Sequence, residues 1–346
     1  MQREDTMRKV NVAILGAGKA GFLFAKAVNA SSNGHLSVLV AATQGEADSV
    51  GAQLSQVDRC TGDWKSAVGD DAVDAVFIAT PTNLHHEMTL AAAGAGKHVL
   101  CDKPMCLCIA EADDMLAVCA EAGVMFMVGF VERFNAAFKV VKERITTGRI
   151  GKPVMVFSRR AHPPRKGSWI MDDAQSGGAF LHTGCHNIDL VQWLFDSPVM
   201  HVTAEQIESG ISPGFTDVAA VIGRLENGVL VSQIESYAHP PTMPMGVDRS
   251  FEVLGTEGSL YLDLFHSPVT LCDQGGWKYE DVLTWVEAGS QLSGALTEET
   301  QYFLDCVLHN RRPDEASGLD GRRTIAVFEA ARQSAREGRR VNVIHQ

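Results

Sequence analysis

The sequence predicts an α/β protein in two parts. The first part is a doubly wound parallel sheet, and the second is an α/β domain with a large open, mostly antiparallel sheet. Short apolar runs alternate with helical patterns as far as residue 130, which is typical of a parallel sheet. Beyond that point, strands with alternating polar and apolar residues follow one another across hairpin-type turns. We therefore expect one domain over residues 1–130 and a second domain over residues 131–346.

Composition narrows the class of protein. The chain has 346 residues, 45% of them hydrophobic and 21% charged, and a net charge of −12. The acidic balance disfavours nucleic acid and anionic membranes as partners, because both bind basic surfaces. The polar N-terminus precedes an apolar run that is too short for a signal core or a membrane span. We expect a cytoplasmic protein with reduced thiols and no metal, since Cys106 and Cys108 lack a second pair at zinc-site spacing.

A glycine-rich turn joins the first predicted strand to the first helix. Residues 10–15 are apolar and branched, and Gly16, Gly18 and Gly21 open the helical pattern that follows. In a dinucleotide-binding turn, the first glycine makes the tight turn, the second lets the backbone approach a pyrophosphate, and the third lets helix and strand pack closely. Five residues of this turn are expected to contact the cofactor: Gly16, Gly18, Lys19, Ala20 and Gly21.

The end of the second predicted strand, residues 36–42, leaves the choice of cofactor open. A carboxylate that holds the ribose hydroxyls of NAD is expected about twenty positions after the glycines. Thr43 and Gln44 stand there instead, so a 2′-phosphate would not be repelled, but no neighbouring Arg or Lys clearly binds one. Thr43 is a candidate cofactor contact, and the cofactor is NAD or NADP.

The next strands end in polar turns at the edge where such sheets bind ligands. Strands are predicted at 74–80, 98–101 and 125–129, with helices at 84–93 and 109–122 between them. The first turn supplies four candidate cofactor contacts: Thr80, Pro81, Asn83 and His85. The second turn presents Lys103 ahead of a proline that stops the strand.

The pattern after Phe130 indicates a second sheet flanked by helices. Helices are predicted at 134–147, 297–310 and 319–338. Strands are predicted at 154–160, 201–208, 217–225, 229–237, 249–254, 259–263 and 341–344. Substrate-pocket loops are expected at 162–173 and 239–248.

The stretch from Gly177 to Leu194 carries an unusual set of titratable residues. His182, His186 and Asp189 are spaced by four and three, so they share one face of a helix. Such a face suits proton transfer, because histidine ionises near neutral pH.

Several runs together resemble the Gfo/Idh/MocA family of oxidoreductases. They are residues 16–21, 79–85, 96–104 and 177–189, and the turn 255–258 and the last helix also fit, so the resemblance covers nearly the whole chain. It implies a dinucleotide-binding Rossmann domain over residues 1–130 and a substrate-binding and oligomerisation domain, built on a large open sheet, over residues 131–346. It implies reversible hydride transfer between NAD(P) and a hydroxyl-bearing carbon of a sugar or cyclitol. It also implies a homodimer or homotetramer formed through that sheet.

The resemblance assigns roles to individual residues. Lys103 would contact the substrate hydroxyl and the nicotinamide, and His186 would be the general base in oxidation and the general acid in reduction. His182 stands where many relatives carry an aspartate, and it is kept as a catalytic and substrate-binding candidate. Asp189 could reach His186 as an alternative partner. Arg160 and Trp169 are candidates to line the substrate pocket, with surface charge and packing as the alternative interpretations.

Three functions remain open from the sequence. The first is an NAD(P)-dependent dehydrogenase or reductase of a sugar, polyol or cyclic alcohol, in which Lys103 stabilises the alkoxide and His186 moves the proton. The resemblance also allows a glycosidase that uses NAD transiently, or a non-catalytic dinucleotide-binding regulator. Retention of Lys103 and His186 argues against the regulator.

Overall fold

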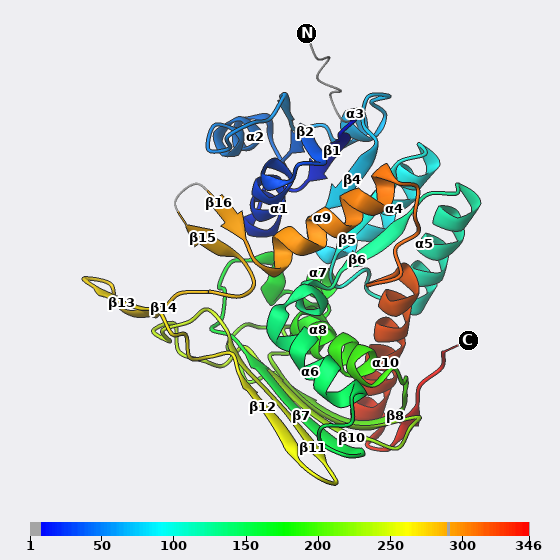
Figure 1. Cartoon of the computed structure of the whole chain (residues 1–346), viewed down its shortest axis with the longest axis vertical. Helices are drawn as coiled ribbons and strands as arrows, with labels where there is room; N and C mark the ends of the chain where they lie inside the picture. Colours follow the sequence, from blue (N-terminus) through cyan, green and yellow to red (C-terminus); the bar gives the residue numbers. More distant parts are fainter. Residues whose placement is uncertain (1–7, 289–290, 346) are drawn as a thin grey trace.

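The computed structural model describes residues 8–288 and 291–345, and it places two sheets one above the other (Figure 1). The first sheet is parallel throughout and has the order β3-β2-β1-β4-β5-β6. Its strands are β1 (Val10–Leu15), β2 (Gly34–Val40), β3 (Arg59–Thr61), β4 (Ala75–Ile78), β5 (His98–Asp102) and β6 (Phe126–Gly129). The strand order reverses between β1 and β4, and ligands of such sheets bind at the carboxyl ends beside that reversal.

Helices connect these strands and cover the sheet. They are α1 (Lys19–Ala30), α2 (Gln44–Gly51), α3 (Trp64–Val68), α4 (His85–Gly94) and α5 (Ile109–Glu121), with a 3₁₀ turn η1 (Thr82–Leu84) before α4. A helix from the far end of the chain, α9 (Ala295–Leu308), joins this layer beside α1 (Figure 1). The rings of Phe24 and Phe303 both lie edge-on to Phe77 of β4, with centroids 5.6 Å away in each case. The core of the first sheet is therefore completed by residues from the last sixth of the chain.

The second sheet has the order β12-β11-β7-β10-β9-β8-β17. Its strands are β7 (Pro153–Ala161), β8 (Val199–Ile207), β9 (Val218–Leu225), β10 (Leu230–Ser236), β11 (Asp248–Gly255), β12 (Ser259–Asp263) and β17 (Val341–Asn342). All neighbouring pairs are antiparallel except β7 and β10, which are parallel. The mostly antiparallel sheet predicted from the sequence is thus confirmed.

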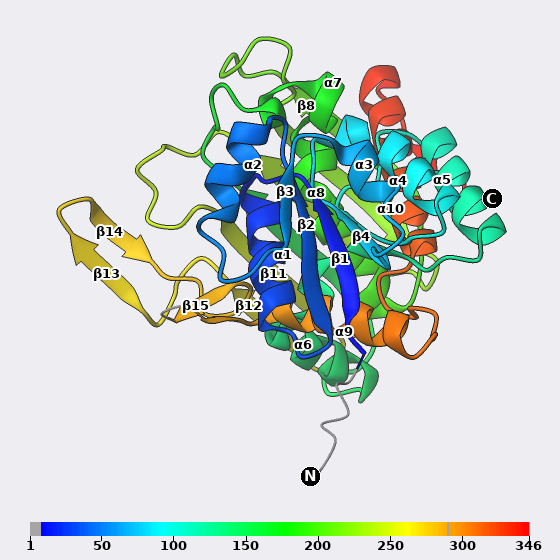
Figure 2. The same ribbon diagram turned by 90° about the horizontal axis from the view of Figure 1, so that it is seen from above.

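Within the part of the chain that the structure describes, helices pack on one face of this second sheet only. They are α6 (Ala136–Thr146), α8 (Gly178–Phe195) and α10 (Gly318–Glu337), and they lie between the two sheets (Figure 1). Helix α8 is enclosed by the rest of the protein, since all of its residues except Gln192 and Trp193 are buried. The view in Figure 2 shows the first sheet stacked over α8. Each side chain of α8 must therefore either contact another part of the protein or face a cavity.

Short segments connect the two layers. The 3₁₀ turn η2 (Val131–Phe134) follows β6 directly, and η3 (Trp169–Met171) and α7 (Asp173–Ser176) lead into α8. Gly177 and Gly178 both have positive φ angles, +80° and +81°, at this sharp entry to the helix. A residue with a side chain would be strained in this backbone conformation.

Some elements were not predicted. They are α2, β3, α3 and the two hairpins β13 (Thr270–Asp273) with β14 (Gly276–Tyr279) and β15 (Val286–Ala288) with β16 (Gln291–Ser293). These segments are short, and the strand β3 has no apolar run because it is a half-buried edge strand. Periodicity needs more residues than such elements contain. Within the described residues, no helix is long and apolar enough to cross a membrane.

Candidate active site

The glycine turn has the geometry of a ligand cradle. Gly16 has a φ of +108°, and a Cβ there would lie 2.4 Å from the carbonyl oxygen of Ala79. A Cβ on Gly21 would lie 1.7 Å from the oxygen of Gly16, so helix and turn meet without a side chain between them. By contrast, a Cβ on Gly18 would meet no atom within 4 Å. Gly18 thus borders open space at the N-terminus of α1, where backbone N–H groups favour an anion. This open cradle fits a dinucleotide pyrophosphate.

The end of β2 carries no carboxylate. Thr43 caps α2 by accepting a hydrogen bond from the Glu46 amide at 3.2 Å. The Gln44 side chain is tied to Asp48 and to the backbone of Cys60. Thr43 and Gln44 are thus both engaged in hydrogen bonds within the chain.

The turn after β4 is held by His85. Its Nδ1 lies 2.9 Å from the Pro104 carbonyl oxygen and its Nε2 lies 3.0 Å from the Thr80 carbonyl oxygen. The ring is buried, and burial lowers the pKa of His85. His85 therefore joins the turn after β4 to the turn that carries Lys103. Pro81 and Asn83 lie at the start of η1 in the same turn.

Lys103 connects the first sheet to α8. Its Nζ donates a hydrogen bond of 2.9 Å to the carbonyl oxygen of His182, 79 positions further along the chain. Its backbone amide donates to Oδ1 of Asp102 at 2.8 Å, which fixes the turn at the end of β5. An ammonium group has three N–H donors, so Lys103 keeps donors for a ligand beside the histidine helix.

His182 and His186 lie on the buried face of α8 next to Lys103. Each has a buried Nδ1 atom without a hydrogen-bond partner among the described residues. Burial and nearby cations lower the pKa of both rings well below the usual value; Lys103 is the strongest charge acting on His182, and Arg160 on His186. Both rings are accordingly neutral at pH 7, and a neutral imidazole can accept a proton.

Aromatic rings and a third histidine enclose His182. Trp169 lies edge-on to its ring, with centroids 5.3 Å apart. His162 stacks on Tyr237 at 5.1 Å, and its Nε2 is 2.8 Å from the hydroxyl oxygen of Thr183 on α8. The sequence predicts Trp169 as a pocket residue, whereas it indicates His162 only as part of a pocket loop.

Arg160 lies in a buried ion cluster. Glu132 of η2 accepts hydrogen bonds from Arg160 of β7 at 3.1 Å and from Arg249 of β11 at 2.6 Å. Burial alone would raise the pKa of Glu132, but the two arginines lower it to about 2. The surface-charge interpretation of Arg160 is therefore wrong, because the side chain is buried.

Glu235 of β10 is a buried acid beside this cluster. Its Oε1 accepts hydrogen bonds from Asn187 at 3.0 Å and Gln233 at 2.6 Å, while its Oε2 has no partner within the described chain. Burial raises the pKa of Glu235 to about 8, against the opposing charge of Arg160. Glu235 is therefore mostly protonated at neutral pH.

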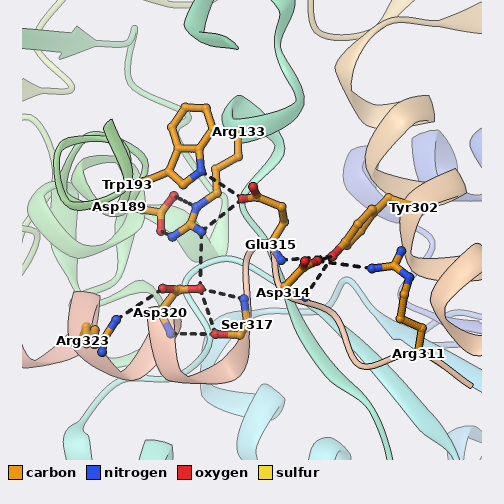
Figure 3. Close-up of polar contacts among 10 residues, drawn as sticks. All are labelled: Arg133, Asp189, Trp193, Tyr302, Arg311, Asp314, Glu315, Ser317, Asp320 and Arg323. Carbon is orange, nitrogen blue, oxygen red and sulfur yellow. Dashed lines mark hydrogen bonds and ion pairs between the residues drawn. The ribbon is translucent and has the colours of Figure 1, made fainter. Parts of the chain in front are cut away.

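Asp189 pairs with Arg133 of η2 rather than with His186. The two side chains form two hydrogen bonds, of 2.6 and 2.9 Å, and Arg133 also reaches Asp320 at the N-terminus of α10 (Figure 3). Burial alone would lower the pKa of Arg133, but Asp189 raises it above the usual value. Glu315 lies 3.6 Å from the same guanidinium and accepts a hydrogen bond from the Trp193 indole.

A cavity of about 440 Å³ opens beside this Arg133 network. None of the histidines, and neither Lys103 nor the glycine turn, lines it. The histidine face of α8 is the candidate site, since Arg133 in the wall of this cavity is already paired with Asp189 and Asp320 (Figure 3).

Comparison with known proteins identifies the class. Residues 10–130 match the family model of an oxidoreductase family with an NAD-binding Rossmann fold, and residues 142–343 match that of its C-terminal alpha/beta domain. The chain belongs to the Gfo/Idh/MocA oxidoreductase family. It is accordingly an oxidoreductase with a Rossmann domain for NAD or NADP.

Individual relatives are similar along almost their full length. The scyllo-inositol 2-dehydrogenase (NAD(+)) of Bacillus subtilis is 29% identical over 338 residues, which are 95% of each chain. The D-xylose 1-dehydrogenase [NADP(+)] of Haloarcula marismortui is 28% identical, over 88% of this chain and 86% of that one. The crystal structure of myo-inositol 2-dehydrogenase from Lactobacillus plantarum is 25% identical, with a TM-score of 0.83 over 97% of this chain and all of that one.

The glycine turn gives a direct test of the cradle. Gly18→Ala should fold normally, because open space receives the methyl group, yet it should weaken NAD binding about tenfold by keeping the pyrophosphate from the backbone. Gly21→Ala is the matched variant and should lower the melting temperature as well, because its Cβ has no room. Melting curves and fluorescence titration with NADH measure the two effects. Equal cofactor affinity of Gly18→Ala and wild type would contradict the assignment.

Glu235 predicts a pH dependence of stability. A carboxyl whose pKa rises from about 4.5 to about 8 on folding stabilises the folded state below pH 4.5, and this stabilisation is lost as the pH rises toward 8. The free energy of unfolding should thus fall by up to about 4 kcal/mol between pH 5 and pH 8 relative to Glu235→Gln. Urea denaturation at several pH values measures the slope. The exposed Glu205→Gln is the control and should keep the wild-type slope.

Proposed function

We propose that the protein is an NAD(P)-dependent dehydrogenase or reductase that moves a hydride to or from a hydroxyl-bearing carbon of a sugar, cyclitol or related cyclic alcohol. The observation that carries this proposal is the hydrogen bond from Lys103 Nζ to the His182 carbonyl. It brings an ammonium group at the carboxyl edge of the cofactor sheet against the helix that carries His182 and His186. The inositol and xylose dehydrogenases named above support the substrate class.

The cofactor would lie along the carboxyl edge of the first sheet. The turn residues Gly16, Gly18, Lys19, Ala20 and Gly21 would hold the pyrophosphate, and Thr43 would lie near the adenosine ribose. Thr80, Pro81, Asn83 and Lys103 would border the nicotinamide half, with His85 bracing the two turns through their carbonyl oxygens. When bound, NAD or NADP accepts or supplies the hydride.

The chain's own residues would manage the proton and the charge. In oxidation, the imidazole of His186 accepts the hydroxyl proton, since burial and nearby cations lower its pKa and keep the ring neutral. The ammonium of Lys103 stabilises the negative charge that develops on the substrate oxygen. In reduction, His186 returns the proton. His182 contributes a second neutral ring at the position next to Lys103.

The walls of the pocket would come from both layers. Trp169 packs on His182 and excludes water from that side. The charge of Arg160 acts on His186 and lowers its pKa, so Arg160 would contribute a positive charge to the pocket. These contacts support Trp169 and Arg160 as substrate-binding residues.

The uncovered face of the second sheet is the proposed contact between copies of the chain. The strand register places Ile222, Ile234 and Leu254 on the face that carries no helix, and they are 56%, 37% and 37% exposed. Apolar side chains grouped on an open sheet favour burial against another protein. We propose a homodimer or homotetramer formed through this face, with residues 131–346 as the unit that assembles.

The catalytic assignment predicts the effect of two substitutions. Lys103→Ala and His186→Asn should each lower kcat for alcohol oxidation by about a hundredfold or more, while the dissociation constant for NADH stays within about threefold. His186→Asn should also remove the acid limb of the pH–rate profile, which should lie below pH 6.5 because the pKa of His186 is lowered. Change in absorbance at 340 nm measures turnover. The surface variant Lys152→Ala is the control, and near-normal turnover of Lys103→Ala would refute the assignment.

The sheet contact predicts a change in assembly. Ile222→Glu puts a charge in the centre of the uncovered face and should dissociate the oligomer into monomers at micromolar concentration. Leu319→Glu is the matched control, because Leu319 is similarly exposed but lies on α10. Sedimentation velocity measures both. A wild-type chain that is monomeric at the same concentration would contradict the proposal.

A further inference from the structure

A hairpin from the C-terminal part of the chain lies against the helix that follows the glycine turn. Its strands β15 and β16 pair antiparallel, with Glu287 opposite Leu292, and they pack beside α1 (Figure 1). Glu287 forms an ion pair with Lys26 of α1, although the two residues are 261 positions apart. The first helix of the cofactor sheet is therefore covered by a segment that follows the strands of the second sheet.

The backbone that leads into this hairpin is fixed at its base. The carbonyl oxygens of Leu283 and Thr284 accept hydrogen bonds from the amides of Ala295 and Leu296, each of 3.0 Å, at the start of α9. Oδ1 of Asp281 accepts hydrogen bonds from the amides of Leu283 and Thr284 at 2.8 and 2.7 Å. The chain is thus held on both sides of its backbone up to the residue before the hairpin begins.

Two side chains of this segment contact two lysines of α1. The Nζ atom of Lys19 lies over the ring of Trp285, 5.2 Å from its centroid, and Lys26 pairs with Glu287. Lys19 and Lys26 are about two helical turns apart and share one face of α1. Trp285 and Glu287 are alternate residues of an extended chain and point to the same side of it. The hairpin is therefore attached to one face of α1 at two points.

The first of these lysines lies in the glycine turn itself. Lys19 is the first residue of α1 and follows Gly18, which borders open space. Lys19 is exposed, and its ammonium forms no hydrogen bond or ion pair with the residues that the structure describes. An ammonium over the face of an indole keeps its N–H donors for another partner. The ammonium is thus held beside the cradle with its donors unused.

We propose that Trp285 is a positioning residue for the cofactor, which holds the ammonium of Lys19 at the cradle where the pyrophosphate binds. A lysine side chain loses rotamer freedom when it binds an anion, and this loss of entropy weakens binding. The indole restricts the lysine before the cofactor arrives, so less freedom is lost on binding. The C-terminal part of the chain thereby strengthens the binding of the cofactor. This inference rests on the position given to the pyrophosphate in the proposed function.

Substitutions of two tryptophans test the role of the indole. Trp285→Leu should raise the dissociation constant for NADH about fivefold, as measured by titration of NADH fluorescence. Trp285→Phe should lie between this variant and wild type, because a benzene ring attracts a cation less strongly than an indole does. Trp277→Leu is the matched control, because Trp277 is 67% exposed on the separate hairpin of β13 and β14, and it should bind NADH as wild type does.

Melting curves show whether each variant folds. Trp285→Phe preserves most of the packing, and it gives the same test, at about a twofold effect, if Trp285→Leu does not fold. Unchanged affinity of Trp285→Phe and of any folded Trp285→Leu for NADH would overturn the inference.

A double-mutant cycle separates positioning of the lysine from packing of the hairpin. Lys19→Met should weaken NADH binding about tenfold. Adding Trp285→Leu or Trp285→Phe to Lys19→Met should then cause little further loss, because the ring acts through the ammonium that has been removed. Losses that multiply in the double variant would assign Trp285 a packing role alone and would overturn the inference.

A cofactor fragment locates the effect along the dinucleotide. ADP-ribose carries the pyrophosphate but lacks the nicotinamide, and its affinity is measured by displacement of NADH. Trp285→Leu, or Trp285→Phe in its place, should weaken ADP-ribose and NADH by the same factor. A loss confined to NADH would assign Trp285 to the nicotinamide and overturn the inference.

The outcomes distinguish this inference from the proposed function. Unchanged NADH affinity in the Trp285 variants would overturn the inference even if sugars or cyclitols are oxidised. Coupling between Lys19 and Trp285 in NADH binding, without turnover of any sugar or cyclitol, would refute the dehydrogenase and support the positioning role of Trp285.

Discussion

The adjacent residues Glu132 and Arg133 hold the two layers of the molecule together. They lie in η2, directly after the last strand of the first sheet, and they point to opposite partners. Glu132 is bound by two arginines of the second sheet, and Arg133 is bound by Asp189 of α8. Burying these ions is costly, and only close pairing offsets the cost, so neither side chain can leave without stranding a charge. The turn η2 thus fixes the cofactor edge against the histidine helix, together with the hydrogen bond from Lys103 to α8.

The ion pairs made by η2 lie beside the candidate active site, and their geometry explains why they suit that position. An apolar contact would allow the layers to slide, whereas two hydrogen bonds between a guanidinium and a carboxylate specify both distance and direction. The Arg133–Asp189 pair lies on the C-terminal part of the α8 stripe that carries His186. Lys103 then needs a single hydrogen bond to α8 to place its ammonium at the histidines.

Much of this architecture follows from the sequence, and the reasons for the exceptions are physical. Apolar runs bounded by glycine and proline predicted the long strands, and the glycine turn predicted the cradle at Gly18. Pairing between distant residues was not predictable, because nothing near Glu132 in the sequence indicates Arg160 or Arg249 as its partners. The position of α9 beside β4 was not predictable for the same reason. The apolar stripe of α9 indicates a buried face but does not identify the sheet that covers it. His162 begins an irregular loop, where no periodicity shows which side chain faces inward.

Helix α8 shows how one stripe of residues can serve two purposes. His182, His186 and Asp189 share a face, as their spacing of four and three predicts. At about 1.5 Å of rise per residue, Asp189 lies roughly 10 Å along the axis from His182. The first part of the stripe therefore lies at the ammonium group of Lys103, beside the proposed substrate pocket. The last part lies at η2 and contacts Arg133. The acid that the sequence offered as a partner for His186 instead fixes the helix, and the imidazole is left without a carboxylate.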